Sequence, residues 1–240
     1  MSWIFGAGMG MFLGGPLGAV VGGVMQHMLT KDTRDRIMSN PAKTNQEALF
    51  VTNLAAIMTK VAMADGHVSQ KEVQLIHNFF ANKLGYRGEE LRFIDGIIKE
   101  TQRLNPDLTQ ICQAFRMASN PEIKMLLVDI TYQIASTDHV ITKNEQSAID
   151  HIASQMGLSK DEHQTIRNQY SHENKEDCYS VFGLDPSATP EEIKKAYRVM
   201  ASQYHPDKVS HLGNELIEFA NKKFTEINAA YDKLKKQRGF

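Results

Sequence analysis

The tripeptide His205-Pro206-Asp207 carries the side chains of this chain that are best suited to chemistry or recognition. The imidazole of His205 could act as a general base, but a base needs a nucleophile or substrate group within hydrogen-bond reach, and no serine or cysteine motif accompanies it. The carboxylate of Asp207 offers a charged acceptor to an arginine or to backbone amides of another protein. We therefore interpret the tripeptide as a recognition element and assign no catalytic residue.

The residues before the tripeptide predict a helix that ends beside it. Thr189 supplies a hydroxyl N-cap, Pro190 fits the first helical position and Glu192 completes a capping box. Apolar side chains follow at helical spacing, at Ile193, Ala196, Tyr197, Met200 and Tyr204. Because Pro206 cannot continue this helix, the tripeptide is predicted to lie in an exposed loop.

A second helix is predicted after Gly213, running antiparallel to the first. Its apolar positions are Ala220, Phe224, Ile227, Tyr231 and Leu234. The first helix also carries Lys194, Lys195 and Arg198 away from its apolar stripe. The hairpin therefore has the tripeptide at its tip and a basic face that suits an acidic partner surface.

The middle of the chain contains an internal repeat. The stretch Ala64–Glu72 is echoed by Thr137–Glu145, and each copy places a capping box between two apolar helices. We therefore predict two related helical halves. Asp65 and Asp138, with neighbouring carboxylates, could hold a hard cation, but neither copy has the alternating oxygen spacing of a calcium loop. We favour loop residues beside helix caps, and assign no metal and no cofactor.

The first thirty residues predict a transmembrane helix. No Asp, Glu, Lys or Arg occurs from Ser2 to Thr30, and ~20 apolar residues suffice to cross ~30 Å of hydrocarbon. Glycines recur every fourth residue, at Gly6, Gly10, Gly14, Gly18 and Gly22. Such a face favours close helix packing, so we expect a homodimer through this segment. A signal peptide is disfavoured by the missing basic n-region, and a flexible tail by the many large apolar residues.

Positive charges follow this segment and none precedes it. They are Lys31, Arg34, Arg36 and Lys43. The expected topology is a single pass with the N-terminus periplasmic and the C-terminal domains cytoplasmic. A formal net charge of -1 disfavours general nucleic-acid binding. Cys112 and Cys178 form no C-x-x-C pair, so we expect neither a zinc site nor a structural disulfide.

The segment from Asp177 to Phe240 resembles the J-domain of DnaJ-like co-chaperones, on the strength of the capped helix, the His-Pro-Asp tripeptide and the aromatic-rich second helix. The repeat region resembles the TerB-like fold. Together with the N-terminal segment, these parts resemble the DjlA family of membrane-anchored co-chaperones. The expected fold class is all-α, divided into a transmembrane segment (1–30), a basic juxtamembrane segment (31–46), a TerB-like domain (47–170), a linker (171–176) and a J-domain (177–240).

The resemblance implies that the chain is no enzyme itself. It implies docking on a DnaK-type chaperone, with stimulation of its ATP hydrolysis, through His205, Pro206, Asp207, Lys194, Lys195 and Arg198. It also implies location in a bacterial inner membrane and service to an unknown client protein. Val199 and Gln203 depart from the family pattern, because these positions are often basic. The short fourth helix of many J-domains also lacks a counterpart before Phe240.

Two other functions remain open. In the first, the chain is a metal- or stress-responsive membrane adaptor that acts mainly through the TerB-like domain. In the second, the glycine-rich segment forms a pore. The linker of residues 171–176 spans at most ~20 Å even when extended, so the J-domain is expected to stay near the middle domain and to act with it.

Overall fold

The computed structural model describes Gly18, Val20, Val24 and residues 45–66, 68–136, 140–171, 178–210 and 212–240. Within these residues the protein is entirely helical, as predicted. The elements are α3 (Asn45–Ala62), η3 (Met63–Asp65), α4 (Gln70–Asn78), η4 (Phe79–Lys83), α5 (Glu89–Leu104), α6 (Leu108–Ala118), α7 (Pro121–Ala135), α8 (Lys143–Met156), α9 (Lys160–Ser171), η5 (Ser180–Phe182), α10 (Pro190–Gln203), α11 (Pro206–Val209) and α12 (Asn214–Arg238).

The predicted transmembrane segment falls almost wholly outside the described residues. Gly18, Val20 and Val24 are helical, and both valines are buried in the hydrophobic core. The glycines at 6, 10, 14 and 22 and the cations of the juxtamembrane segment lie outside the described part. Among the helices that the structure describes, none has the length and apolar character needed to cross a membrane.

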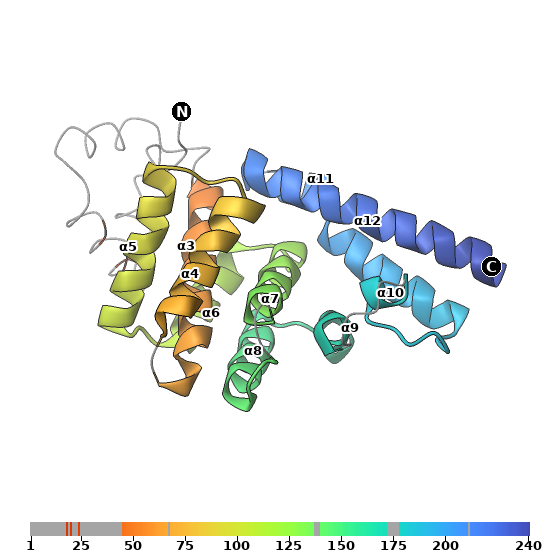
Figure 1. Cartoon of the computed structure of the whole chain (residues 1–240), viewed down its shortest axis with the longest axis horizontal. Coiled ribbons are helices and arrows are strands. Elements are labelled where there is room, and N and C mark those ends of the chain that lie inside the picture. The colour runs from red at the N-terminus through yellow and green to blue at the C-terminus, as the bar shows by residue number, and fades with distance from the viewer. Residues whose placement is uncertain are drawn as a thin grey trace.

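Helices α3 to α8 form a bundle around α3 and α7. Helix α3 packs against α5, α6 and α7, and α7 packs in turn against α8 and α9 (Figure 1). Both inner helices are apolar on nearly all sides, which is typical of a helix at the centre of a core. Helix α7 buries almost its whole length, from Ile123 to Ala135.

The predicted capping boxes are present and define the two halves of the bundle. The Ser69 amide donates to the Glu72 carboxylate over 2.7 Å, and the Thr142 amide donates to Glu145 over 2.8 Å. Asp65 of η3, in the first copy of the repeat, accepts a 2.7 Å hydrogen bond from the Asn144 side chain in the second copy. The repeat thus ties its two copies to each other.

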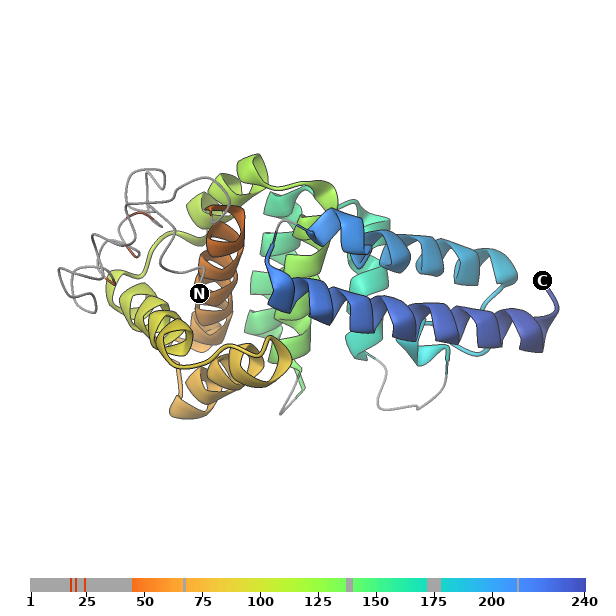
Figure 2. The ribbon, with the colours of Figure 1, turned by 90° about the horizontal axis from the view of Figure 1, so that it is seen from above.

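The C-terminal hairpin also forms as predicted. Helices α10 and α12 pack along each other, with the rings of Tyr197 and Tyr231 stacked at 4.0 Å between centroids. The Tyr197 hydroxyl donates to Asn228 of α12 over 3.0 Å. Figure 2 shows the two helices side by side, projecting from the bundle.

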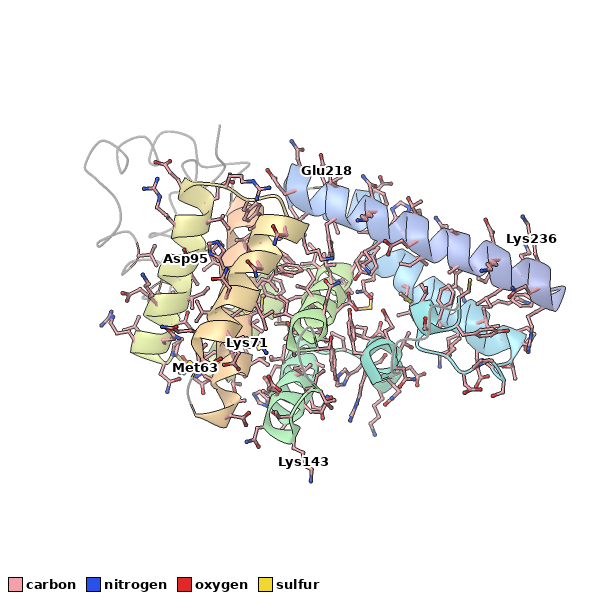
Figure 3. The ribbon with its side chains drawn as sticks, viewed as in Figure 1. Met63, Lys71, Asp95, Lys143, Glu218 and Lys236 are labelled. Carbon is pink, nitrogen blue, oxygen red and sulfur yellow. The ribbon has the colours of Figure 1, made fainter. Side chains whose placement is uncertain are left out.

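The hairpin is docked on the bundle. Helix α10 packs against α7 and α9, and α9 lies between the bundle and the hairpin (Figure 1). Phe79 of η4 meets Phe219 of α12 at 6.1 Å between ring centroids. In Figure 3, Glu218 marks the end of α12 that lies over the bundle, and Lys236 marks the end that projects away from it. The buried residues of both parts form one hydrophobic cluster.

The cap of α10 leads to a stability prediction. Thr189→Ala removes the hydroxyl that accepts from the Glu192 amide over 3.2 Å, so the free energy of unfolding should fall by about 1 kcal/mol. Thr225→Ala in exposed mid-helix of α12 is the matched control and should be neutral or slightly stabilising. Urea denaturation measures the free energy of unfolding of both variants. An equal decrease in the two would contradict the role of the cap.

Candidate functional site: the His-Pro-Asp turn

The tripeptide lies at the tip of the hairpin, but it is not simply a loop. Helix α10 ends at Gln203, and a short helix, α11, begins at Pro206. The expectation of an exposed loop was therefore wrong for Pro206 and Asp207. The reason is that proline, which stops the preceding helix, suits the first position of the next one. His205 is the N-cap of α11, and its Nδ1 accepts from the Asp207 amide over 3.3 Å.

The two polar side chains of the turn remain accessible. The Asp207 side chain is 89% exposed and the His205 side chain 45% exposed, with 3.9 Å between the carboxylate and Nδ1. The imidazole meets the Phe224 ring of α12 edge to face at 5.6 Å between centroids. Helix α12 therefore orients His205, while Asp207 points a free carboxylate toward solvent.

The three predicted cations of α10 lie in different surroundings. The Lys194 ammonium lies 5.0 Å from the centre of the Phe240 ring. The Arg198 guanidinium is exposed and donates to the Lys194 carbonyl over 3.2 Å. Lys195 is turned toward the bundle and forms a 2.7 Å ion pair with Asp161 of α9. Lys194 and Arg198 thus lie apart from the bundle contact, whereas Lys195 takes part in it.

Lys208, which directly follows the tripeptide, was not among the predicted residues. Its ammonium lies 3.1 Å from the Glu122 carboxylate in the first turn of α7. Asn120, the N-cap of α7, donates to the Lys208 carbonyl over 3.4 Å. The N-terminal end of α7 therefore lies beside the turn.

A buried carboxylate also contacts the helix that leads into the turn. Asp129 of α7 is 1% exposed and accepts hydrogen bonds from the hydroxyls of Tyr204 and of Tyr170 in α9, the latter over 3.0 Å. Burial raises the pKa of Asp129, while the hydrogen bonds from the tyrosines and the nearby Lys223 oppose that rise. Burial also raises the pKa of both tyrosines well above the usual value, so their hydroxyls stay protonated as donors. The sequence signal was an Asp within the apolar run from Met125 to Ile130.

Val199 and Gln203, the two residues that depart from the family pattern, lie in the same contact between α10 and the bundle. Val199 packs partly buried against the core, and Gln203 is fully buried near Asp129, although its side-chain amide has no hydrogen-bond partner among the described residues. Lys195, Val199 and Gln203 are spaced four residues apart, so they share one face of α10. A charged side chain at position 199 would lose hydration against the hydrophobic core, so the apolar Val199 fits its surroundings.

The metal site considered for Asp65 and Asp138, which we disfavoured from the sequence, cannot be assembled from the described residues. Asp65 is engaged by Asn144 and Thr142, and Asp138 lies outside the described part. The described residues contain no group of three or more potential metal ligands. Cys112 is a buried free thiol whose pKa burial raises to about 12, so it is not a reactive thiolate at neutral pH.

Two family models match the chain. Residues 52–168 match the family of tellurite resistance protein TerB, and residues 177–238 match the DnaJ domain. The co-chaperone protein DjlA of Shewanella oneidensis is 27% identical over 211 residues, covering 81% of this chain and 80% of that protein. DjlA of Photobacterium profundum is 27% identical and covers 99% of this chain and 98% of that protein.

The similarity extends to a more distant relative. DjlA of Escherichia coli K12 is 23% identical over 265 residues, covering 99% of this chain and 97% of that protein. No solved structure matches the chain. The TerB match falls on the helical bundle and the DnaJ match on the hairpin with its exposed turn. The chain therefore has a TerB domain followed by a C-terminal DnaJ domain, and it is similar over most of its length to proteins named co-chaperone protein DjlA.

Proposed function

We propose that this chain is a membrane-anchored co-chaperone that recruits a DnaK-type chaperone and stimulates its ATP hydrolysis. The chemistry of hydrolysis belongs to the partner, and this chain acts by binding. The observation that carries the proposal is the exposed His205-Pro206-Asp207 turn at the tip of a DnaJ hairpin, beside the cations of α10. The names of the relatives, co-chaperone proteins, support the same role.

Each residue of the proposed binding site has a physical role. Asp207 presents a carboxylate that can accept hydrogen bonds from an arginine of the partner. Pro206 fixes the backbone of the turn, and His205 caps it. Lys194 and Arg198, with Lys195 once its ion pair opens, supply positive charge for an acidic surface.

The location and assembly of the protein belong to the same proposal. An uncharged segment of this length, followed by four cations within residues 31–46, supports a single pass through a bacterial inner membrane with the DnaJ domain in the cytoplasm. The glycine repeat supports a homodimer through that segment.

Charge reversal on α10 tests the proposed binding face. Arg198→Glu should weaken binding of the ATP-loaded chaperone to the labelled chain by about tenfold at low salt, mainly through slower association. The loss should shrink as added salt screens the charges. Fluorescence anisotropy and stopped-flow mixing measure the affinity and the association rate.

Lys236→Glu is the matched control, because it makes the same charge change at an exposed position of the same domain, on the projecting end of α12 (Figure 3). Its affinity should stay within about twofold of the wild type. Equal losses in both variants would mean that only net charge matters, and the proposed face would be wrong.

A further inference from the structure

We propose that the TerB domain positions the His-Pro-Asp turn, through a hydrogen bond between the buried Asp129 carboxylate and the Tyr204 hydroxyl. Tyr204 immediately precedes His205 and is the C-cap residue of α10. Asp129 belongs to α7, in the centre of the TerB bundle. The inference rests on the proposed function. It implies that the TerB and DnaJ domains act together when the chain binds the chaperone.

The hydrogen bond between Tyr204 and Asp129 is buried. Asp129 is 1% exposed and Tyr204 is 1% exposed, so the hydrogen bond does not compete with water. Tyr170, at the end of α9, donates to the other carboxylate oxygen over 3.0 Å. The buried Asp129 carboxyl group keeps both of its tyrosine donors only while α7, α9 and α10 keep their relative positions, because an unsatisfied buried polar group is costly.

The surrounding contacts hold the same end of the hairpin. Lys208, which directly follows the tripeptide, is paired with Glu122 of α7 over 3.1 Å. Phe219 packs edge to face against Phe79 of the bundle and lies 6.2 Å from the Tyr204 ring. The residues directly before and directly after the tripeptide, Tyr204 and Lys208, thus both contact α7 of the TerB domain, while Asp207 itself stays exposed.

The ring of Tyr204 and its hydroxyl have separable roles. The ring is buried in the hairpin core, as the apolar stripe of α10 requires, whereas the hydroxyl reaches out of the hairpin to α7. Tyr204→Phe keeps the ring and removes only the link to the TerB domain. Tyr197→Phe is the matched control, because Tyr197 lies on the same helix and its hydroxyl bonds to Asn228 within the hairpin.

The experiment uses the full chain and two readouts. The first is amide hydrogen exchange of residues 200–209 without the chaperone, with the bundle helices α3 and α5 as internal reference. The second is single-turnover ATP hydrolysis by a DnaK-type chaperone, titrated with the chain to separate the half-maximal concentration from the maximal stimulation. Tyr204→Phe should speed exchange in residues 200–209 alone and raise the half-maximal concentration by about fivefold. The half-maximal concentration of Tyr197→Phe should stay within about twofold of the wild-type value.

A double-mutant cycle connects the effect to Asp129. Asp129→Asn leaves a neutral amide of the same shape, and its effect combined with Tyr204→Phe should be smaller than the product of the two single effects. Tyr170→Phe is the further variant if Asp129→Asn does not fold; it should produce a smaller change in the same exchange window.

Several outcomes would overturn the inference. Unchanged exchange and unchanged stimulation in Tyr204→Phe would show that the contact does not position the turn. Stronger stimulation would show that docking restrains the DnaJ domain instead of preparing it. If the wild-type chain gives no stimulation, the proposed function fails, and the exchange of residues 200–209 alone decides whether the TerB domain orders the turn.

Discussion

Replacing His205 by Gln is expected to remove most of the stimulation of ATP hydrolysis, a loss of at least about tenfold, while the chain stays folded. The imidazole is half exposed, lies edge to face on Phe224 and caps α11 through Nδ1. The glutamine amide oxygen can still accept the cap hydrogen bond, so the turn keeps its backbone. What disappears is the rigid ring beside Asp207, which a partner would have to recognise.

His151→Gln is the matched control for this prediction. His151 is exposed on α8, where its Nε2 lies 3.0 Å from the Thr109 hydroxyl, and it is a TerB residue outside the proposed site. This variant should stimulate hydrolysis like the wild type in single-turnover assays. If His205→Gln stimulates hydrolysis as strongly as the wild type, the His-Pro-Asp turn is not needed for stimulation.

The second large effect is expected from Gly183→Ala, at the junction of the two domains. Gly183 has φ +62°, and a Cβ atom there would lie 2.5 Å from the Gln169 backbone nitrogen in α9. The left-handed backbone alone costs an alanine ~1–2 kcal/mol. Since backbone cannot move aside cheaply, the contact adds more, and we expect a total loss above about 3 kcal/mol in the free energy of unfolding.

Gly239→Ala separates backbone strain from the clash. Gly239 has φ +71°, and nothing lies within 4 Å of a Cβ placed there. The free energy of unfolding of Gly239→Ala, measured by urea denaturation alongside Gly183→Ala, should fall by only ~1 kcal/mol. If both variants lose equal stability, η5 does not pack closely on α9 and the docked arrangement of the domains is wrong.

Local signals allowed much of this fold to be predicted. Thr189 with Glu192, and Ser69 with Glu72, are capping boxes that act over three residues, and all their hydrogen bonds are present. The stripe of apolar residues on α12 has the period of a helix, and Ala220, Ile227 and Leu234 are buried as that period requires. Such features depend on the chain nearby and need no knowledge of distant contacts.

The remaining features depend on residues far apart in the chain. Asp129 meets Tyr204 only because α7 and α10 pack together, and Lys195 meets Asp161 only because α9 lies against the hairpin. The sequence showed Val199 and Gln203 as departures from a family pattern, but not the surface that they contact. The short helix α11 was missed because Pro206 was interpreted only as a stop signal.

The most direct measurement of the central claim is hydrogen exchange of the full chain with and without an ATP-loaded DnaK-type chaperone. We expect slower exchange at the exposed amides of residues 194–209, which include the basic face of α10 and the His-Pro-Asp turn, and no change in α5 or α8. Protection confined to the TerB bundle would contradict the account, because the chain would then engage this chaperone through the bundle instead of the turn.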